Sequence, residues 1–348
     1  MLCIRFTLFV MMFFILSACA PGKQAVKERY FWPPPPDEPR IEFLGAYYSE
    51  NDLPGGTDFK IFQTILGTEA ELTFQSPLIV ASNSEGWLVV SDPTNRGFIS
   101  VDVKARKFNV LGGAVMSQVV KPTGVDFDAE GLVYAGDDIS RKIYVVSRDN
   151  KVHRVLDLSK DIKSVGGFVI DKKLRRIIIP DPRSNAVAIF STDGKLLKLF
   201  GKRGGMDGEF NNPLSAALDS NGNIYITDSF NAVVQKFTPD GVFISKFGKR
   251  GDAVGDFGVI KGIALDSDDN IYVSDGKFHR VQIFNSEGAL LMSLGAAHTQ
   301  RPGEGIVAAG FLIPYGIYID KKNQIFVADM MNRRLQFFQY FPEKKPVK

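Results

Sequence analysis

The chain contains very little cysteine. Of its 348 residues only two are cysteines, Cys3 and Cys19, and both lie close to the N-terminus. The rest of the chain therefore cannot form a disulfide, supply a thiol nucleophile or build a cysteine-ligated metal site.

Histidine is almost as rare, and the common catalytic motifs are absent. The three histidines are His153, His279 and His298. The repeat described below places His153 in an outer strand, so the other two cannot complete a site of three histidines. The chain also lacks Gly-x-Ser-x-Gly, His-Glu-x-x-His and Cys-x-x-Cys-His motifs. We therefore predict no catalytic residue, no metal site and no cofactor.

Charge of one sign is not in excess either. The 42 Lys and Arg residues nearly balance the 39 Asp and Glu residues, which gives a net charge of +3. This balance gives no indication of nucleic-acid binding.

What the chain does contain is a repeat. Four short runs rich in Val, Ile, Phe and Tyr recur in each copy, and Gly, Asp, Asn or Pro bound them, as is typical of strands joined by tight turns. The second run of each copy ends at an aspartate, and successive aspartates are 45, 44, 47, 47 and 54 residues apart. A period in the forties with four strands per copy predicts an all-β fold, a six-bladed β-propeller of four-stranded antiparallel blades. The aspartates are Asp92, Asp137, Asp181, Asp228, Asp275 and Asp329.

The last copy is one strand short. Residues 315–340 supply three strands, whereas residues 40–47 form an unused strand-like run near the front of the chain. We predict that this N-terminal strand completes the last blade and closes the ring, because closure removes an open sheet edge.

Two segments carry a family resemblance. The run Gly222–Asp228, followed by Asn231, resembles the NHL repeat, as does the link over residues 247–257. The front of the chain, residues 32–41, is similar to that of bacterial NHL-repeat lipoproteins. The resemblance implies a six-bladed propeller and mostly binding roles, and it does not imply one activity.

The N-terminus has the features of an export signal. Residues 1–18 combine Arg5 with an apolar run over 6–16 that is too short to span a membrane. Leu16-Ser-Ala-Cys19 matches the bacterial lipobox, which predicts acylation of Cys19; an ordinary signal with an incidental cysteine is the alternative. Ala20 favours the outer membrane by the sorting rule known for enteric lipoproteins.

These features give the expected domain organisation. A signal peptide over 1–18 precedes a lipidated, proline-rich tether over 19–39, a propeller over 40–341 and a C-terminal tail over 342–348. We expect the prolines at 33–36 to form a stiff polyproline II spacer. Tyr30, Phe31 and Trp32 are expected to dock on the propeller rim.

A binding surface is expected on one face of the ring. The strands of each blade are lettered a to d from the centre of the ring outward. The b-to-c loops and the d-to-a links emerge on the same face, here called the link face. This face holds the irregular insertions, including an expected short amphipathic helix over 57–66. The candidate apolar contact residues are Phe230, Phe278, Met330 and Met331, and the basic candidates are Lys202, Arg203, Lys249, Arg250 and Arg301. The alternatives are apolar residues folded inward and basic residues that are simply solvated.

The aspartate series permits two interpretations. A ring of carboxylates could hold a metal ion, but one aspartate per blade at the same position is also what a structural rule produces. We favour the second interpretation, in which each aspartate accepts backbone N–H bonds in its own b-to-c turn.

The preferred functional hypothesis is a non-catalytic, lipid-anchored scaffold that binds an envelope protein or glycan. It is expected to be a monomer that meets the membrane only through its lipid. One alternative is a metal-assisted lyase or hydrolase acting in the central channel. A second is an accessory subunit of an envelope redox or assembly complex. The enzyme hypothesis would be favoured if the purified protein contained Ca²⁺ or Zn²⁺ and if substitution of the aspartates removed both the metal and an activity.

Overall fold

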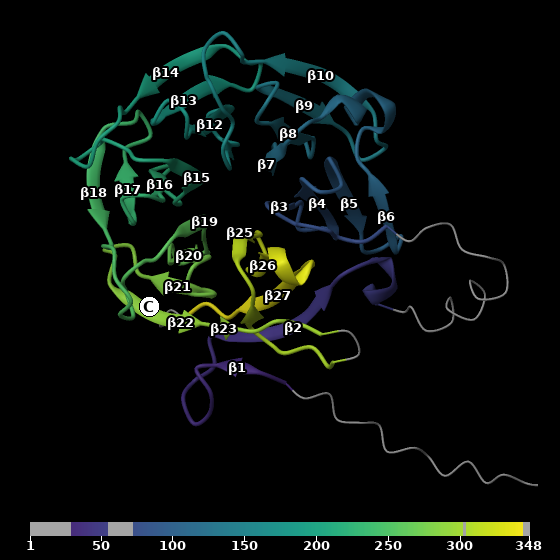
Figure 1. Ribbon diagram of the computed structural model, residues 1–348, viewed down its shortest axis with the longest axis vertical. Helices are drawn as coiled ribbons and strands as arrows, with labels where there is room; N and C mark the ends of the chain where they lie inside the picture. Colours follow the sequence, from purple (N-terminus) through teal and green to yellow (C-terminus); the bar gives the residue numbers. More distant parts are fainter. Residues whose placement is uncertain (1–28, 55–71, 302–303, 344–348) are drawn as a thin grey trace, which may run out of the picture.

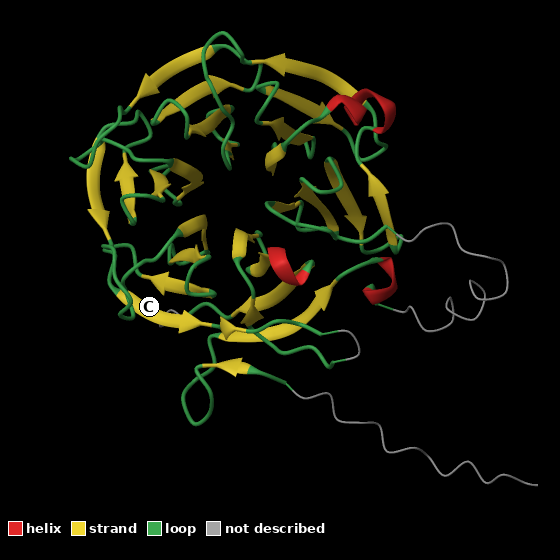
Figure 2. Ribbon diagram, viewed as in Figure 1, coloured by secondary structure: helices red, strands yellow, loops and turns green. Residues whose placement is uncertain are grey.

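A computed structural model describes residues 29–54, 72–301 and 304–343. These residues form six four-stranded antiparallel blades arranged in a ring, which confirms the predicted fold (Figure 1). Strands dominate, and the helical segments are the short 3₁₀ turns η1 (Glu50–Asp52), η2 (Gly113–Gln118) and η3 (Met330–Asn332) (Figure 2).

The first five blades each use four consecutive strands. They comprise β3–β6 (Val80–Ser82, Trp87–Asp92, Gly97–Asp102, Lys107–Val110), β7–β10 (Pro122–Phe127, Val133–Asp137, Lys142–Val146, Val152–Asp157), β11–β14 (Val169–Asp171, Arg176–Asp181, Ala186–Ser191, Leu196–Phe200), β15–β18 (Pro213–Leu218, Ile224–Asp228, Val233–Phe237, Phe243–Phe247) and β19–β22 (Ile260–Leu265, Ile271–Asp275, Arg280–Phe284, Leu290–Leu294). A short parallel pair, β23 (Ala296–Ala297) and β24 (Gly310–Phe311), lies in the link to the sixth blade.

The sixth blade joins the two ends of the chain. It contains β25 (Pro314–Ile319), β26 (Gln324–Asp329), β27 (Arg334–Tyr340) and the N-terminal strand β2 (Ile41–Tyr47). β2 runs antiparallel to β27, with Ile41 opposite Tyr340 and Tyr47 opposite Leu335. The predicted closure by an N-terminal strand is therefore confirmed.

The proline run does not form the expected extended spacer. β1 (Phe31–Trp32) pairs with β2, and the N–H of Arg40 donates to the carbonyl of Trp32 at 2.8 Å, so residues 33–39 turn back on themselves. The aromatic residues explain the turn, because the Trp32 ring packs against Phe338 at 6.0 Å and Tyr30 against Phe43 at 6.4 Å. The predicted docking on the rim is confirmed for Tyr30 and Trp32, whereas the Phe31 ring lies against Arg29. The polyproline II prediction is wrong.

The core lies between the blades. The first and second blades pack face to face, and the Trp87 and Phe127 rings lie 5.1 Å apart between them. The third and fourth blades meet in the same way through residues such as Ile178 and Ile226. One sheet cannot bury both of its faces alone, so the stacking of neighbours holds the ring together.

The innermost strands approach each other closely around the channel. A Cβ atom on Gly262 would lie 2.6 Å from the carbonyl oxygen of Tyr315 in the next blade, and one on Gly316 would lie 2.5 Å from that of Leu78. Glycine is required here because the contact is with a neighbouring backbone, which cannot move aside.

Candidate functional site

The link face is defined by the strand register. In the fourth blade the first residue of strand a, Pro213, lies opposite the last residue of strand b, Asp228, and the fifth and sixth blades repeat this pairing. The b-to-c loops therefore lie beside the d-to-a links. Every candidate contact residue belongs to one of these two kinds of loop.

The aspartates that end the second strands stabilise these loops. Asp92 accepts the N–H groups of Gln75 and Ser76 from the incoming link, together with that of Asn95 from its own turn. Asp275 likewise accepts N–H bonds from the link and from its own turn. The bonds thus reach further than predicted, since each carboxylate joins a link to a turn.

The same carboxylates are not arranged as a metal site. Within residues 29–54, 72–301 and 304–343, no three His, Cys, Asp or Glu side chains are grouped so that they could hold a metal ion. The six aspartates are spread around the ring, one per blade, and are engaged by N–H and hydroxyl donors of their own blades.

Two of the four apolar candidates project into solvent. Phe230 is 58% exposed and Met331 is 54% exposed, whereas Phe278 and Met330 are half-buried. The Phe278 ring lies under two cations, with Lys277 Nζ at 5.3 Å and the Arg280 guanidinium at 5.0 Å from its centroid. Phe230 in the fourth blade and Met331 in the sixth blade are therefore the two candidates that solvent reaches most freely.

The loop that carries Phe230 is rigidly held although its side chain is exposed. The Phe230 N–H donates to the carbonyl of Asn211 at 3.0 Å, and its own carbonyl accepts Arg250 Nη2 at 2.7 Å. Asn231 Nδ2 donates to Asp228 and to the carbonyl of Gly204. An aromatic side chain is thus presented on a fixed backbone.

Three of the five basic candidates have side chains that contact local partners. Lys202 Nζ lies 3.3 Å from Glu209, and Lys249 Nζ lies 3.7 Å from Asp256 at the equivalent place in the next link. Arg250 donates to the carbonyls of Gly258 and Phe230. Arg203 and Arg301 are exposed, and the backbone N–H of Arg301 donates to Glu304.

The mouth of the central channel is a separate feature of the link face, and the residues that line it were not predicted from the sequence. A cavity of about 270 Å³ opens there, and a second cavity of about 190 Å³ lies deeper in the channel. Both are lined by Ile79, Gly167 and Ser215. Lys121, Asp138, Arg183 and Tyr315 line the outer cavity only.

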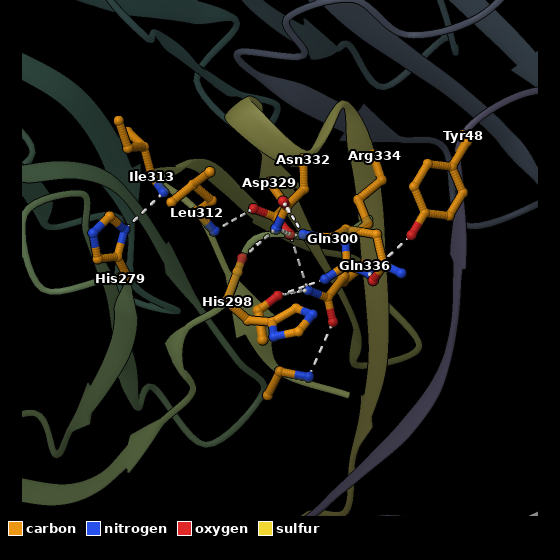
Figure 3. Close-up of polar contacts among 12 residues, drawn as sticks. Tyr48, His279, His298, Gln300, Leu312, Ile313, Asp329, Asn332, Arg334 and Gln336 are labelled. Carbon is orange, nitrogen blue, oxygen red and sulfur yellow. Dashed lines mark hydrogen bonds and ion pairs between the residues drawn. The ribbon is translucent and has the colours of Figure 1, made fainter. Parts of the chain in front are cut away.

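Polar side chains of the sixth blade fasten the longest link to the ring (Figure 3). Arg334 is fully buried; its Nε lies 2.8 Å from Asp329 and its Nη1 donates to Tyr48 and Gln300. Burial raises the pKa of Asp329, and the Arg334 charge opposes that rise. Sequence reasoning missed Arg334, since an arginine at the start of a strand gives no sign of burial.

The histidines are dispersed. His153 lies in the outer strand β10, as predicted. His279 Nδ1 accepts the N–H of Ile313, and the carbonyl of His298 accepts Asn332 Nδ2. The two remaining histidines thus serve loop contacts on the link face (Figure 3).

Several predictions fall on residues outside the described part of the chain, including the signal peptide over 1–18. Cys19 and the expected helix over 57–66 both lie there. No helix among the described residues has the length and apolar character needed to cross a membrane.

Comparisons with known proteins agree with this architecture. The NHL repeat model matches residues 257–284, which cover the first three strands of the fifth blade. No curated protein matches the chain. Solved structures with the same fold include three proteins of different described roles.

These three are distant from the chain in sequence. Virginiamycin B lyase from Staphylococcus aureus is 14% identical with a TM-score of 0.56, over 77% of this chain and 96% of that one. A gluconolactonase from Xanthomonas campestris is 16% identical with a TM-score of 0.57, over 86% and 98%. An auxiliary nutrient binding protein from Bacteroides thetaiotaomicron is 14% identical with a TM-score of 0.58, over 77% and 69%. At these identities the likeness shows the fold alone, and the chain is a six-bladed β-propeller that carries an NHL repeat in its fifth blade.

Proposed function

We propose that this propeller is an exported, lipid-anchored and non-catalytic scaffold that captures a protein partner on its link face. The observation that carries the proposal is the exposure of Phe230 and Met331 on b-to-c loops of that face. Aromatic and methionine side chains are enriched at protein interfaces, where a few such anchors supply most of the binding energy.

The rigidity of the Phe230 loop supports the same proposal. Hydrogen bonds from Phe230 to Asn211 and from Arg250 to Phe230 hold its backbone in place. A fixed loop loses little conformational entropy on binding, so more of the contact energy appears as affinity.

The charges favour a protein over an anionic glycan at these loops. Lys202 and Lys249 each lie beside a carboxylate of their own link, Glu209 and Asp256. These two lysines are thus paired within their own links, and the exposed apolar side chains remain as the distinctive feature. No observation on the described residues favours a metal-assisted lyase or hydrolase, or an accessory subunit of a redox complex.

Affinity capture from cross-linked envelope extract tests the partner proposal. The bait is residues 20–348, compared with a face variant that carries Phe230→Ala and Met331→Ala. A control variant carries Leu199→Ala and Ile244→Ala, which remove equally exposed apolar side chains from the outer strands β14 and β18. We expect one defined protein to be retained by the parent and the control and lost by the face variant. Capture that is equal for all three baits, or absent for all three, would contradict the proposal.

The lipid anchor is tested by substitution of the two cysteines in turn. Each buried CH₂ group contributes about 0.8 kcal/mol, so several acyl chains hold a protein on a membrane. We expect Cys19→Ser to abolish palmitate labelling and to release the protein from the membrane fraction. Cys3→Ser is the matched control and should behave as the parent. Labelling that survives Cys19→Ser would show that the anchor proposal is wrong.

A further inference from the structure

The outer channel cavity has an unbalanced charge. Lys121 Nζ and Arg183 Nη2 lie 2.9 Å and 3.0 Å from the same oxygen of Asp138, Oδ2. Two cations therefore share one carboxylate at the cavity wall. One positive charge is left without a counter-charge in this group.

Asp138 is held in place as the support of the two cations. Its side chain is only 7% exposed, and its other oxygen, Oδ1, accepts the N–H of Val165 at 3.2 Å. Arg183 is oriented further by a hydrogen bond from Nη1 to the carbonyl of Lys163. The Arg183 side chain is nevertheless 46% exposed, and a guanidinium has five N–H donors, so donors remain for a ligand.

A further cation lies behind the aromatic wall of the cavity. Lys261 Nζ is 5.1 Å from the centroid of the Tyr315 ring, and Tyr315 lines the cavity. Among the residues that the structure describes, Lys261 has no ion-pair partner. Burial lowers the pKa of Lys261, and the charge of Asp275 only partly opposes this effect.

The cavity also contains a hydroxyl group without a partner. Ser215 is 4% exposed, lines both channel cavities and has no hydrogen bond from its Oγ within the described part of the chain. Buried hydroxyls are normally hydrogen-bonded, so an unpaired one in a cavity wall is available to a ligand once its side chain turns toward the cavity.

We propose that the outer channel cavity binds a small polyhydroxy carboxylate, such as a sugar acid. The carboxylate would pair with Arg183 and Lys121, and the ligand body would lie against the Tyr315 ring. A ligand hydroxyl would hydrogen-bond to Ser215. This site goes beyond the protein-capture role, because it lies at the channel mouth rather than on the loop tips.

Calorimetric titration of residues 20–348 with D-glucuronate and D-gluconate tests this site. Methyl glucoside serves as the uncharged comparison. We expect binding of at least one acid, no binding of the glucoside, and weaker binding as salt is raised. Absence of binding by both acids at 10 mM, or equal binding of the glucoside, would overturn the proposal.

Three substitutions locate the binding. Arg183→Gln should weaken it by about tenfold or more, because a charge-assisted hydrogen bond is lost. Ser215→Ala removes a hydroxyl that has no internal partner, so the variant should melt as the parent does and bind the acid several-fold more weakly. Lys195→Gln, at an exposed position before β14, should have no effect. Unchanged affinity in both Arg183→Gln and Ser215→Ala would overturn the site, whereas partner capture is measured separately and tests only the scaffold role.

Discussion

The buried aspartates that end the second strands show how one residue position can organise a repeat. Asp228 is fully buried, and its carboxylate accepts the N–H of Asn211 and the side-chain amide of Asn231. Burial outweighs these hydrogen bonds and raises the pKa of Asp228 to about 6. The residue fastens the loop at the cost of holding a desolvated charge at neutral pH.

This raised pKa predicts a pH dependence of stability. Between the unfolded pKa, about 4, and the folded value of about 6, the folded protein binds more protons at Asp228 than the unfolded chain does. The contribution of Asp228 to stability therefore falls as pH rises through this window. Asp228→Asn removes the titration. We expect the variant to be less stable than the parent at pH 4.5 and the difference to narrow at pH 7.5, measured by urea unfolding. A difference that widens with pH would contradict this assignment.

The roles of individual residues were partly predictable from the sequence. The structural role of the aspartates was predicted because a fixed position in every copy indicates a rule of the fold. Their bonds to the incoming links were not predicted, since the links precede the aspartates by about seventeen residues. Whether Phe230 pointed outward could not be decided either, because the answer depends on neighbouring loops.

At the scale of elements, buried glutamines hold the links of the last three blades. Gln235, Gln282 and Gln336 each lie seven residues after the aspartate of their blade. Gln282 Oε1 accepts the N–H of Gly255 at 2.7 Å, and its Nε2 donates to the carbonyl of Asp256 at 2.8 Å. The other two glutamines bond equivalent residues of their own links. This constant spacing of seven residues is present in the sequence, but a pattern of apolar runs does not reveal it.

Replacing one of these glutamines should loosen its link selectively. Gln282→Leu leaves the Gly255 N–H without its side-chain partner, which costs about 1–3 kcal/mol for a buried unpaired group. The Asp256 carbonyl keeps one donor, Arg280 Nη2 at 3.0 Å. We expect faster hydrogen exchange at the Gly255 amide and a lower melting temperature. The Gly208 amide, which bonds to Gln235 in the preceding blade, is the internal control and should be unaffected. Unchanged exchange at Gly255 would show that the glutamine does not hold the link.

The proline segment shows where local reasoning failed. Four successive prolines favour an extended chain, but Trp32 and Tyr30 before them pack on Phe338 and Phe43. These contacts form only once the sixth blade exists. Tertiary packing therefore overrides the local preference and turns the segment back along β2.

At the scale of the whole molecule, the ring depends on a strand borrowed from the other end of the chain. β2 covers the edge of β27, and Ile41 is buried in the core shared by the fifth and sixth blades. The count of strands per copy was sufficient to predict this closure. The channel cavity was not predictable in the same way, because Lys121, Arg183 and Tyr315 come from three different blades.

Removal of the closing strand should open the ring. A chain that begins at residue 49 lacks β1 and β2 and would leave the edge of β27 unpaired, which favours aggregation. A chain that begins at residue 29 retains both strands and is the matched control. We expect cooperative melting and a single monomer peak in size-exclusion chromatography for the control only. Cooperative melting of the shorter chain at the same temperature would contradict the role of β2.

The most direct test of the scaffold role is site-specific photo-cross-linking in intact cells. A photoreactive phenylalanine analogue replaces Phe230 on the link face in one strain and Leu199 on the outer strand β14 in another. We predict a discrete cross-linked product with one envelope protein from position 230 and no such product from position 199. The same product from both positions, or none from position 230, would contradict the assignment of the link face as the binding surface.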